Sequence, residues 1–84
     1  MDNENALSLA TARTADLDAK LSGFLPRSVV ILRQHPAGDW IAVWRTDEDL
    51  IACAGAAHPV DAIDALAARA AKMVAALGRG GDHA

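Results

Sequence analysis

The spacing of hydrophobic and polar residues changes along the chain, and the first segment has the spacing of a helix. Between Asn5 and Leu21 there is no glycine or proline. The residues that recur at helical spacing on one stripe are Leu7, Ala10, Thr14, Leu17 and Leu21. Gly23 and Pro26 follow this stripe, and both residue types commonly end helices. The pattern predicts a first helix over residues 5–21.

The middle of the chain is rich in β-branched residues, which favour strands. Ser28–Gln34 is the clearest case, and together with Asp39–Thr46 and Asp49–Gly55 it predicts three strands. His35–Gly38 separates the first two with residues typical of turns, and Asp47-Glu48 separates the last two as a tight turn. Connections this short predict that successive strands pair as an antiparallel meander.

The last segment has the clearest helical pattern. Pro59 suits the first position of a helix, and Asp61 and Asp64 place negative charge where the helix dipole favours it. The apolar face of this helix consists of Ile63, Leu66, Ala67, Ala70, Met73, Val74 and Leu77. We expect Gly78 to end the helix and residues 79–84 to form a flexible tail.

Together these segments predict the fold class. The chain has 84 residues, which is enough for one domain and too few for two. We expect residues 1–84 to form a single small α+β domain, with an ordered core over about residues 5–78. Its order is α-β-β-β-α, and its three-stranded antiparallel sheet packs with two helices.

The two turns also predict which side chains share a face of the sheet. A four-residue loop at His35–Gly38 pairs Val30 with Val43, and the two-residue turn then pairs Val43 with Ala52. One face carries Val30, Leu32, Ile41, Val43, Ala52 and Ala54. The other face carries Val29, Ile31, Arg33, Trp40, Ala42, Trp44, Ile51 and Cys53.

Neither predicted face is polar, although an antiparallel sheet with one side in water usually alternates. An exposed apolar face of this size is unusual for a soluble monomer, so we expect the face with both tryptophans to be covered. Three covers are open: the first helix crossing to that side, a second copy of the chain, or a different macromolecule. Tryptophan is common both in cores and at binding hot spots.

The charge and the cysteine content narrow the classes of function. The net charge is −3, whereas domains that bind nucleic acids are usually basic. Arg27, Arg33 and Arg45 lie on or beside the predicted sheet and keep nucleic-acid binding as an alternative. Cys53 is the only cysteine and cannot form an intramolecular disulfide, which favours the reducing cytoplasm. We find no signal-peptide pattern and no apolar run long enough to span a membrane.

The residues that could carry catalysis or bind metal are few. His35, His58 and His83 are the only histidines, and their spacing does not match a metal site. Cys53 and His58 are the available types for a nucleophile and its base, but alanines flank Cys53 and favour a small buried side chain. No glycine-rich phosphate loop precedes a helix. We therefore expect no enzyme, no cofactor and no metal.

Two families resemble the chain in topology. The order α-β-β-β-α, with Gly55 before an alanine-rich last helix, resembles a double-stranded RNA-binding domain. That family has lysines at the start of its last helix, and residues 59–64 here carry acids instead. Residues 28–77 also resemble the β-β-β-α unit of HicB-type antitoxins, through His58-Pro59 at the start of the helix. A likeness of fold does not carry a function by itself.

These observations predict a small acidic protein-binding module that is a regulator, inhibitor or adaptor. It would occlude a surface of its partner, as antitoxins and phage-encoded inhibitors do. The residues expected to bind the partner, or a second copy in a homodimer, are Trp40, Trp44, Ile31, Arg33, Asp47, Glu48 and Asp49. The alternatives are a nucleic-acid-binding domain and a self-assembling structural subunit.

Overall fold

The computed structural model describes the backbone of residues 2–83 and the side chains of residues 5–77. The predicted order α-β-β-β-α and the small α+β fold are confirmed. The elements are α1 (Asp2–Phe24), β1 (Val29–Gln34), β2 (Trp40–Arg45), β3 (Leu50–Ala56) and α2 (Pro59–His83). The three strands form one antiparallel sheet with β2 in the centre.

Helix α1 extends further than the sequence pattern predicts. Gly23 lies inside the helix and lacks the positive φ of a glycine that ends one. The helix ends at Phe24 because Pro26 has no N–H and disfavours a helical conformation in the residue before it. Proline is therefore the effective stop, and glycine is not.

Helix α2 begins as predicted and ends later. Pro59 is its first residue, as its fixed φ and missing N–H favour. The helix continues past Gly78 to His83, because no proline follows the glycine to stop it. The predicted tail at residues 79–84 therefore has a helical backbone as far as His83, and Ala84 lies outside the described residues. In the backbone that the structure describes, neither helix has a stretch long and apolar enough to cross a membrane.

The loop between β1 and β2 has three residues, one fewer than the four-residue loop predicted at His35–Gly38. The N–H of His35 donates to the carbonyl of Asp39 at 2.6 Å, and the N–H of Gly38 donates to the carbonyl of His35 at 2.8 Å. Pro36 therefore takes the first corner of a type I turn, a position that proline favours. Gly38 completes the loop with φ at 107°, a conformation open to glycine and costly for other residues.

The turn between β2 and β3 is the predicted one, but an irregularity follows it. The N–H of Thr46 donates to the carbonyl of Asp49 at 2.8 Å, which confirms the two-residue turn at Asp47-Glu48. Arg45 then pairs with Leu50, but Trp44 pairs with Ala52, so Ile51 is an extra residue in the ladder. Such a bulge shifts the register by one residue.

Because of these two departures, each side chain of β2 points to the face opposite to the predicted one. Val30 pairs with Trp44 and Leu32 with Ala42, so the predicted register is wrong by one residue at the first hairpin. The bulge in β3 adds a second shift, which cancels the first between the outer strands. Val30 and Leu32 of β1 therefore share a face with Ala52 and Ala54 of β3 as predicted, and β2 is reversed.

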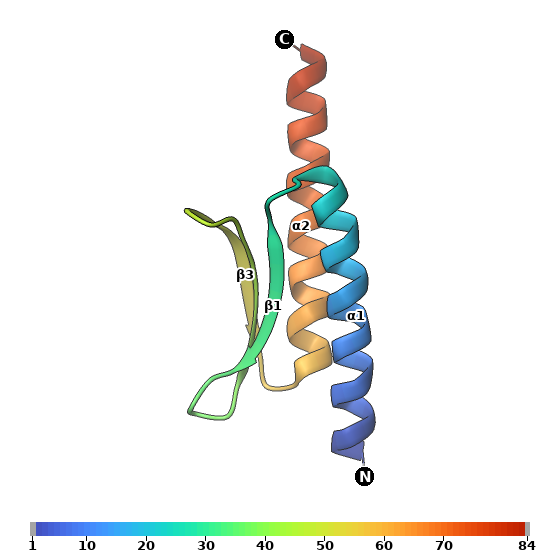
Figure 1. The fold of residues 1–84 in the computed structure, drawn as a ribbon, viewed down its shortest axis with the longest axis vertical. Coiled ribbons are helices and arrows are strands. Elements are labelled where there is room, and N and C mark those ends of the chain that lie inside the picture. Colours follow the sequence, from blue (N-terminus) through green and yellow to red (C-terminus); the bar gives the residue numbers. More distant parts are fainter. Residues whose placement is uncertain (1, 84) are drawn as a thin grey trace.

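Both helices pack on the same face of the sheet, so the protein has two layers (Figure 1). Between the layers lies a core of Ala10, Leu21, Val30, Ala42, Trp44, Ala54, Ala62, Ile63, Leu66 and Ala70. Trp44, Ile63 and Leu66 are its largest fully buried side chains. The alanines let the helices approach the sheet, and Trp44 supplies much of the buried area. The three-layer arrangement considered above, with α1 on the opposite side, is not the one observed.

Candidate functional site

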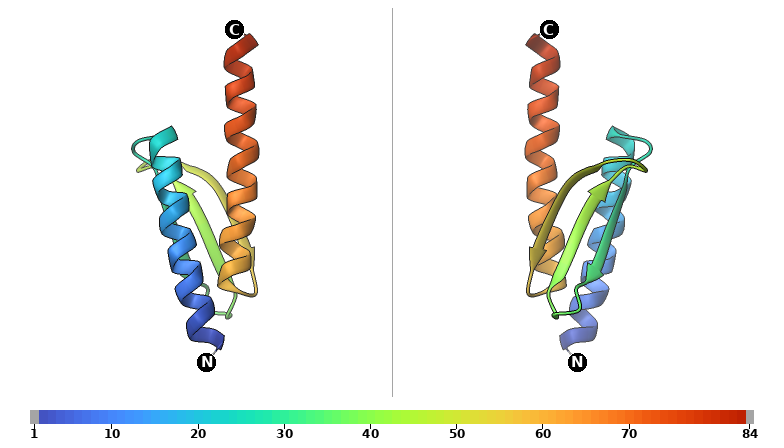
Figure 2. Two further views of the ribbon diagram at one scale, coloured as in Figure 1. Left: turned by 90° about the vertical axis from the view of Figure 1, so that its right-hand side faces the viewer. Right: turned by 90° about the vertical axis from the view of Figure 1, so that its left-hand side faces the viewer.

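The face of the sheet that the helices leave bare is the main candidate for a functional surface (Figure 2). We call this surface the open face, and its residues are Val29, Ile31, Arg33, Ile41, Val43, Arg45, Leu50 and Cys53. The cross-strand pairs place Val43 at its centre, between Ile31 and Cys53. Val29 is 45% exposed and Ile31 is 40% exposed. A contiguous apolar patch therefore faces solvent in the isolated chain.

The two tryptophans lie on the other side of the sheet, which corrects their predicted placement. Trp44 is 1% exposed and belongs to the core, while Trp40 is half-buried at the margin of the core. The reversal of β2 is the cause, because side chains alternate between the faces of a strand. The predicted grouping of the tryptophans with Ile31 and Arg33 on one face is therefore wrong, and Trp44 cannot reach a partner without opening the domain.

Ile31 and Arg33 are the predicted partner-binding residues that do lie on the open face. Arg45 joins them there, although the predicted register separates the two arginines. Arg33 and Arg45 stand near opposite ends of the face, about 14 Å apart along the strand direction by the rise per residue. The face is thus apolar at its centre, with one cationic side chain near each end.

The predicted acidic residues form a turn at one end of the open face. Asp47, Glu48 and Asp49 are all exposed there, and we call them the acidic turn. The hydroxyl of Thr46 accepts the N–H of Asp49 at 3.0 Å and helps to fix the turn. Arg45 Nε donates to the carbonyl of Thr46 at 3.1 Å, so one arginine of the open face is held against the acidic turn. The rim of the surface therefore carries both signs of charge.

Among the side chains considered for catalysis or metal binding, His35, Cys53 and His58 do not converge, and the side chain of His83 lies outside the described residues. The Nδ1 atom of His35 accepts the N–H of Ala37 at 3.1 Å within its own loop. His58 precedes α2, and its carbonyl accepts the N–H of Ala62 at 3.1 Å as the first bond of that helix. Cys53 is exposed on the open face, so the expectation of a small buried side chain is wrong. Among the described residues there is no group of three side chains that could hold a metal ion.

The sequence contains a signal for the open face that residue alternation alone does not provide. Pro36 and Gly38 stand at the second and fourth positions of a four-residue turn, where proline and glycine favour type I geometry. This geometry is typical of a three-residue hairpin loop, which sets the observed register. Applied to the sequence, it would have placed Ile41 and Val43 beside Ile31. The bulge at Ile51 has no comparable signal.

The chain was also compared with models of protein families, with curated proteins and with solved structures, and none of them matched.

Proposed function

We propose that the protein is a non-enzymatic protein-binding module, which acts as a regulator or adaptor by covering a surface of a larger protein. The observation that supports this proposal best is the open face. Soluble proteins seldom leave a contiguous apolar patch in water unless it serves an interaction. Val29, Ile31, Ile41 and Val43 form such a patch here, and no helix of the described chain covers it.

The size of the open face favours a larger partner over a second copy stacked on the same face. Three strands of roughly six residues give a projected area of about 300 Å², from the usual strand spacing and rise. Each side of a standard stable interface buries about 800 Å². The partner would therefore extend beyond the sheet onto the acidic turn. There, basic residues at the rim of the partner's surface would face Asp47, Glu48 and Asp49.

Affinity capture with matched variants tests this proposal. Tagged wild-type protein, Ile31→Asp and Leu9→Asp would be incubated with nuclease-treated lysate of the source cell. Leu9 is 46% exposed on α1, close to the 40% exposure of Ile31, so it controls for a charge placed on an apolar surface. We expect a stoichiometric protein that the wild type and Leu9→Asp retain and Ile31→Asp loses. Circular dichroism checks that both variants are folded.

Cys53 provides a second measurement on the same surface. Its thiol is exposed on the open face and should react readily with a thiol-specific reagent in the isolated chain. A partner bound to the open face should slow this reaction at least tenfold, because it excludes the reagent from the surface. Unchanged reactivity in the complex would contradict binding at this face. Slower reaction at high protein concentration without a partner would show that a second copy covers it.

Nucleic-acid binding is a second candidate because Arg33 and Arg45 share the open face. The half-buried and buried tryptophans are not on that face and cannot serve there as stacking platforms. Titration with RNA and DNA at two salt concentrations separates the candidates, since phosphate contacts give a steep salt dependence. Measurable, salt-sensitive affinity that is lost in an Arg33→Gln variant would favour this candidate over protein binding.

A further inference from the structure

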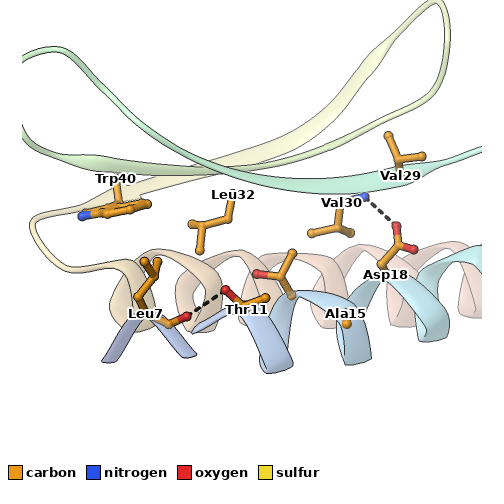
Figure 3. A pocket seen from close by; sticks show the side chains of 9 residues that line it. Leu7, Thr11, Ala15, Asp18, Val29, Val30, Leu32 and Trp40 are labelled. Atoms are coloured by element: carbon orange, nitrogen blue, oxygen red, sulfur yellow. Dashed lines mark hydrogen bonds between the residues drawn. The ribbon is translucent and has the colours of Figure 1, made fainter. Parts of the chain in front are cut away.

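A groove lies on the helix side of the sheet, between α1 and the edge strand β1, and Val29 is the one open-face residue among those that line it (Figure 3). Its volume is about 490 Å³, within the range of small binding sites. Leu7 from α1 and Leu32 and Trp40 from the sheet line it. The hydroxyl of Thr11 donates to the carbonyl of Leu7 at 2.8 Å inside the helix, so this polar group is already satisfied. We call this hollow the edge groove.

The groove exists because α1 presents small residues where a large side chain would be needed to fill the gap. Thr11, Thr14 and Ala15 are the small lining residues of α1 that follow Leu7 toward the middle of the helix. Leu7 itself remains 45% exposed, although its position in the helical stripe predicts a core residue. The edge of the domain therefore has apolar walls and an unfilled interior, which a side chain from outside can occupy.

The backbone of β1 beside this groove is also open to a partner. β1 pairs with β2 on one side only, so its other side is a free edge of the sheet. In an antiparallel ladder, hydrogen-bonded pairs alternate with pairs that share no hydrogen bond. His35 donates its N–H to the carbonyl of Asp39, so the odd-numbered residues of β1 are the ones bonded to β2. The even-numbered residues of β1 therefore direct their N–H and C=O groups away from β2. Leu32 presents such groups directly beside the groove.

Asp18 on α1 supports this assignment and adds a charge. The N–H of Val30, which belongs to the same outward row, donates to Asp18 Oδ1 at 2.8 Å (Figure 3). Among the side chains that the structure describes, the one ion pair joins Arg13 and Asp64, and Asp18 has no cationic partner. Asp18 also lines the groove. The Asp18 carboxylate therefore makes one end of the groove acidic, and it already accepts the backbone N–H of Val30.

We propose that the edge groove binds an extended peptide segment of another protein, which adds to β1 as a further strand of the sheet. The peptide backbone pairs with the outward N–H and C=O groups of Leu32. This pairing ends at Val30, because Asp18 already accepts the N–H of Val30. The peptide side chain opposite Leu32 is apolar and enters the groove, because directly paired residues share a face. A lysine or arginine at the Asp18 end complements the carboxylate. This site does not depend on the function proposed for the open face.

A synthetic peptide tests the proposal directly. The probe is acetyl-Lys-Thr-Val-Thr-Leu-Thr-Val-amide, which alternates apolar and polar residues and carries a lysine at one end. Trp40 lines the groove, so its fluorescence should shift to shorter wavelength on binding, while buried Trp44 gives a constant background. We expect saturable binding to the full chain. The reactivity of Cys53 should stay unchanged, because β3 lies at the opposite edge of the sheet.

Two matched changes identify the contacts. Leu7→Gln should weaken binding about tenfold, as expected for losing half of a leucine contact. Leu9→Gln should leave the affinity within about twofold, because Leu9 is equally exposed on α1 but does not line the groove. The same peptide with N-methylated amides on its pairing edge should not bind, since methylation removes the backbone donors.

Each of the following outcomes would overturn the proposal. The first is no change in Trp40 emission at millimolar peptide. The second is an equal effect of Leu7→Gln and Leu9→Gln, or full binding of the N-methylated peptide, because neither fits strand addition at this groove. The third is a concentration-dependent dimer in analytical ultracentrifugation that Leu7→Gln abolishes, which would assign the groove to a second copy of the chain.

Discussion

On the covered face of the sheet Trp44 is 1% exposed beneath two helices, whereas on the open face Ile31 is 40% exposed and neither described helix lies over it. The side chains of both faces are largely apolar, so composition does not distinguish them. The difference is one of size and shape. The covered face combines alanines with tryptophans, which suits the close approach of helices, while the open face carries branched aliphatic side chains. Burial within the chain thus follows packing geometry, and an apolar face can remain free for a partner.

The largest expected effect contrasts the central residues of the two faces. Trp44→Ala should lower the free energy of unfolding by about 3–5 kcal/mol, because it empties the middle of the core. This loss approaches the whole stability expected for a domain of this size. Val43→Ala, on the open face of the same strand, should cost only about 1 kcal/mol. Urea unfolding followed by far-ultraviolet circular dichroism measures both. Similar losses for both variants would contradict the assignment of the faces.

A smaller effect sharpens the comparison at the loop that decides which face β2 presents. Gly38→Ala should destabilise the domain by about 1–2 kcal/mol, because φ at 107° is strained for any residue with a Cβ. Gly23→Ala is the control, since this glycine is helical and a Cβ built on it meets nothing within 4 Å. It should stabilise the domain by about 0.5–1 kcal/mol through helix propensity. Thermal unfolding midpoints that move in opposite directions would support the three-residue loop, and a neutral Gly38→Ala would argue against it.

The smallest effect concerns how the helices are fastened over the covered face. Arg13 on α1 and Asp64 on α2 form an ion pair whose side chains are 45% and 49% exposed. Because water and salt screen an exposed pair, Arg13→Gln should cost about 0.2–1 kcal/mol at low ionic strength and less in high salt. A double-mutant cycle with Asp64→Asn isolates the interaction. A coupling energy above this range would mean that the pair, and not only the core, holds α1 in place.

The sequence predicts the elements of this protein better than the way they face one another. Helical periodicity locates both helices, Pro59 marks the start of α2, and β-branched runs locate the strands. These are local signals, in which each residue acts within a few positions of itself. The register depends instead on whether the loop has an odd or an even number of residues. A change of one residue in the length of the loop before Trp40 therefore moves every side chain of β2 to the other face.

The same uncertainty in register limits what the sequence predicts about the candidate sites. Ile31 and Arg33 are assigned to the correct face because β1 is the reference strand, whereas Trp40 and Trp44 are assigned to the wrong one with the rest of β2. The edge groove could not be predicted at all. It depends on the distance between α1 and β1 and on Leu7 staying exposed, which are properties of tertiary packing and not of a periodic pattern.

The indole nitrogen of Trp44 is buried and has no hydrogen-bond partner in the described structure. Its proton therefore has no contact with solvent while the domain is closed, and exchange with deuterium must wait until the core opens. The indole protons of the two tryptophans should therefore exchange at different rates. The Trp40 indole, half-buried at the margin, reports local breathing of the groove, and the Trp44 indole reports the global opening of the whole domain. A series of nuclear magnetic resonance spectra, recorded after transfer to deuterium oxide, would follow both indole protons in one sample.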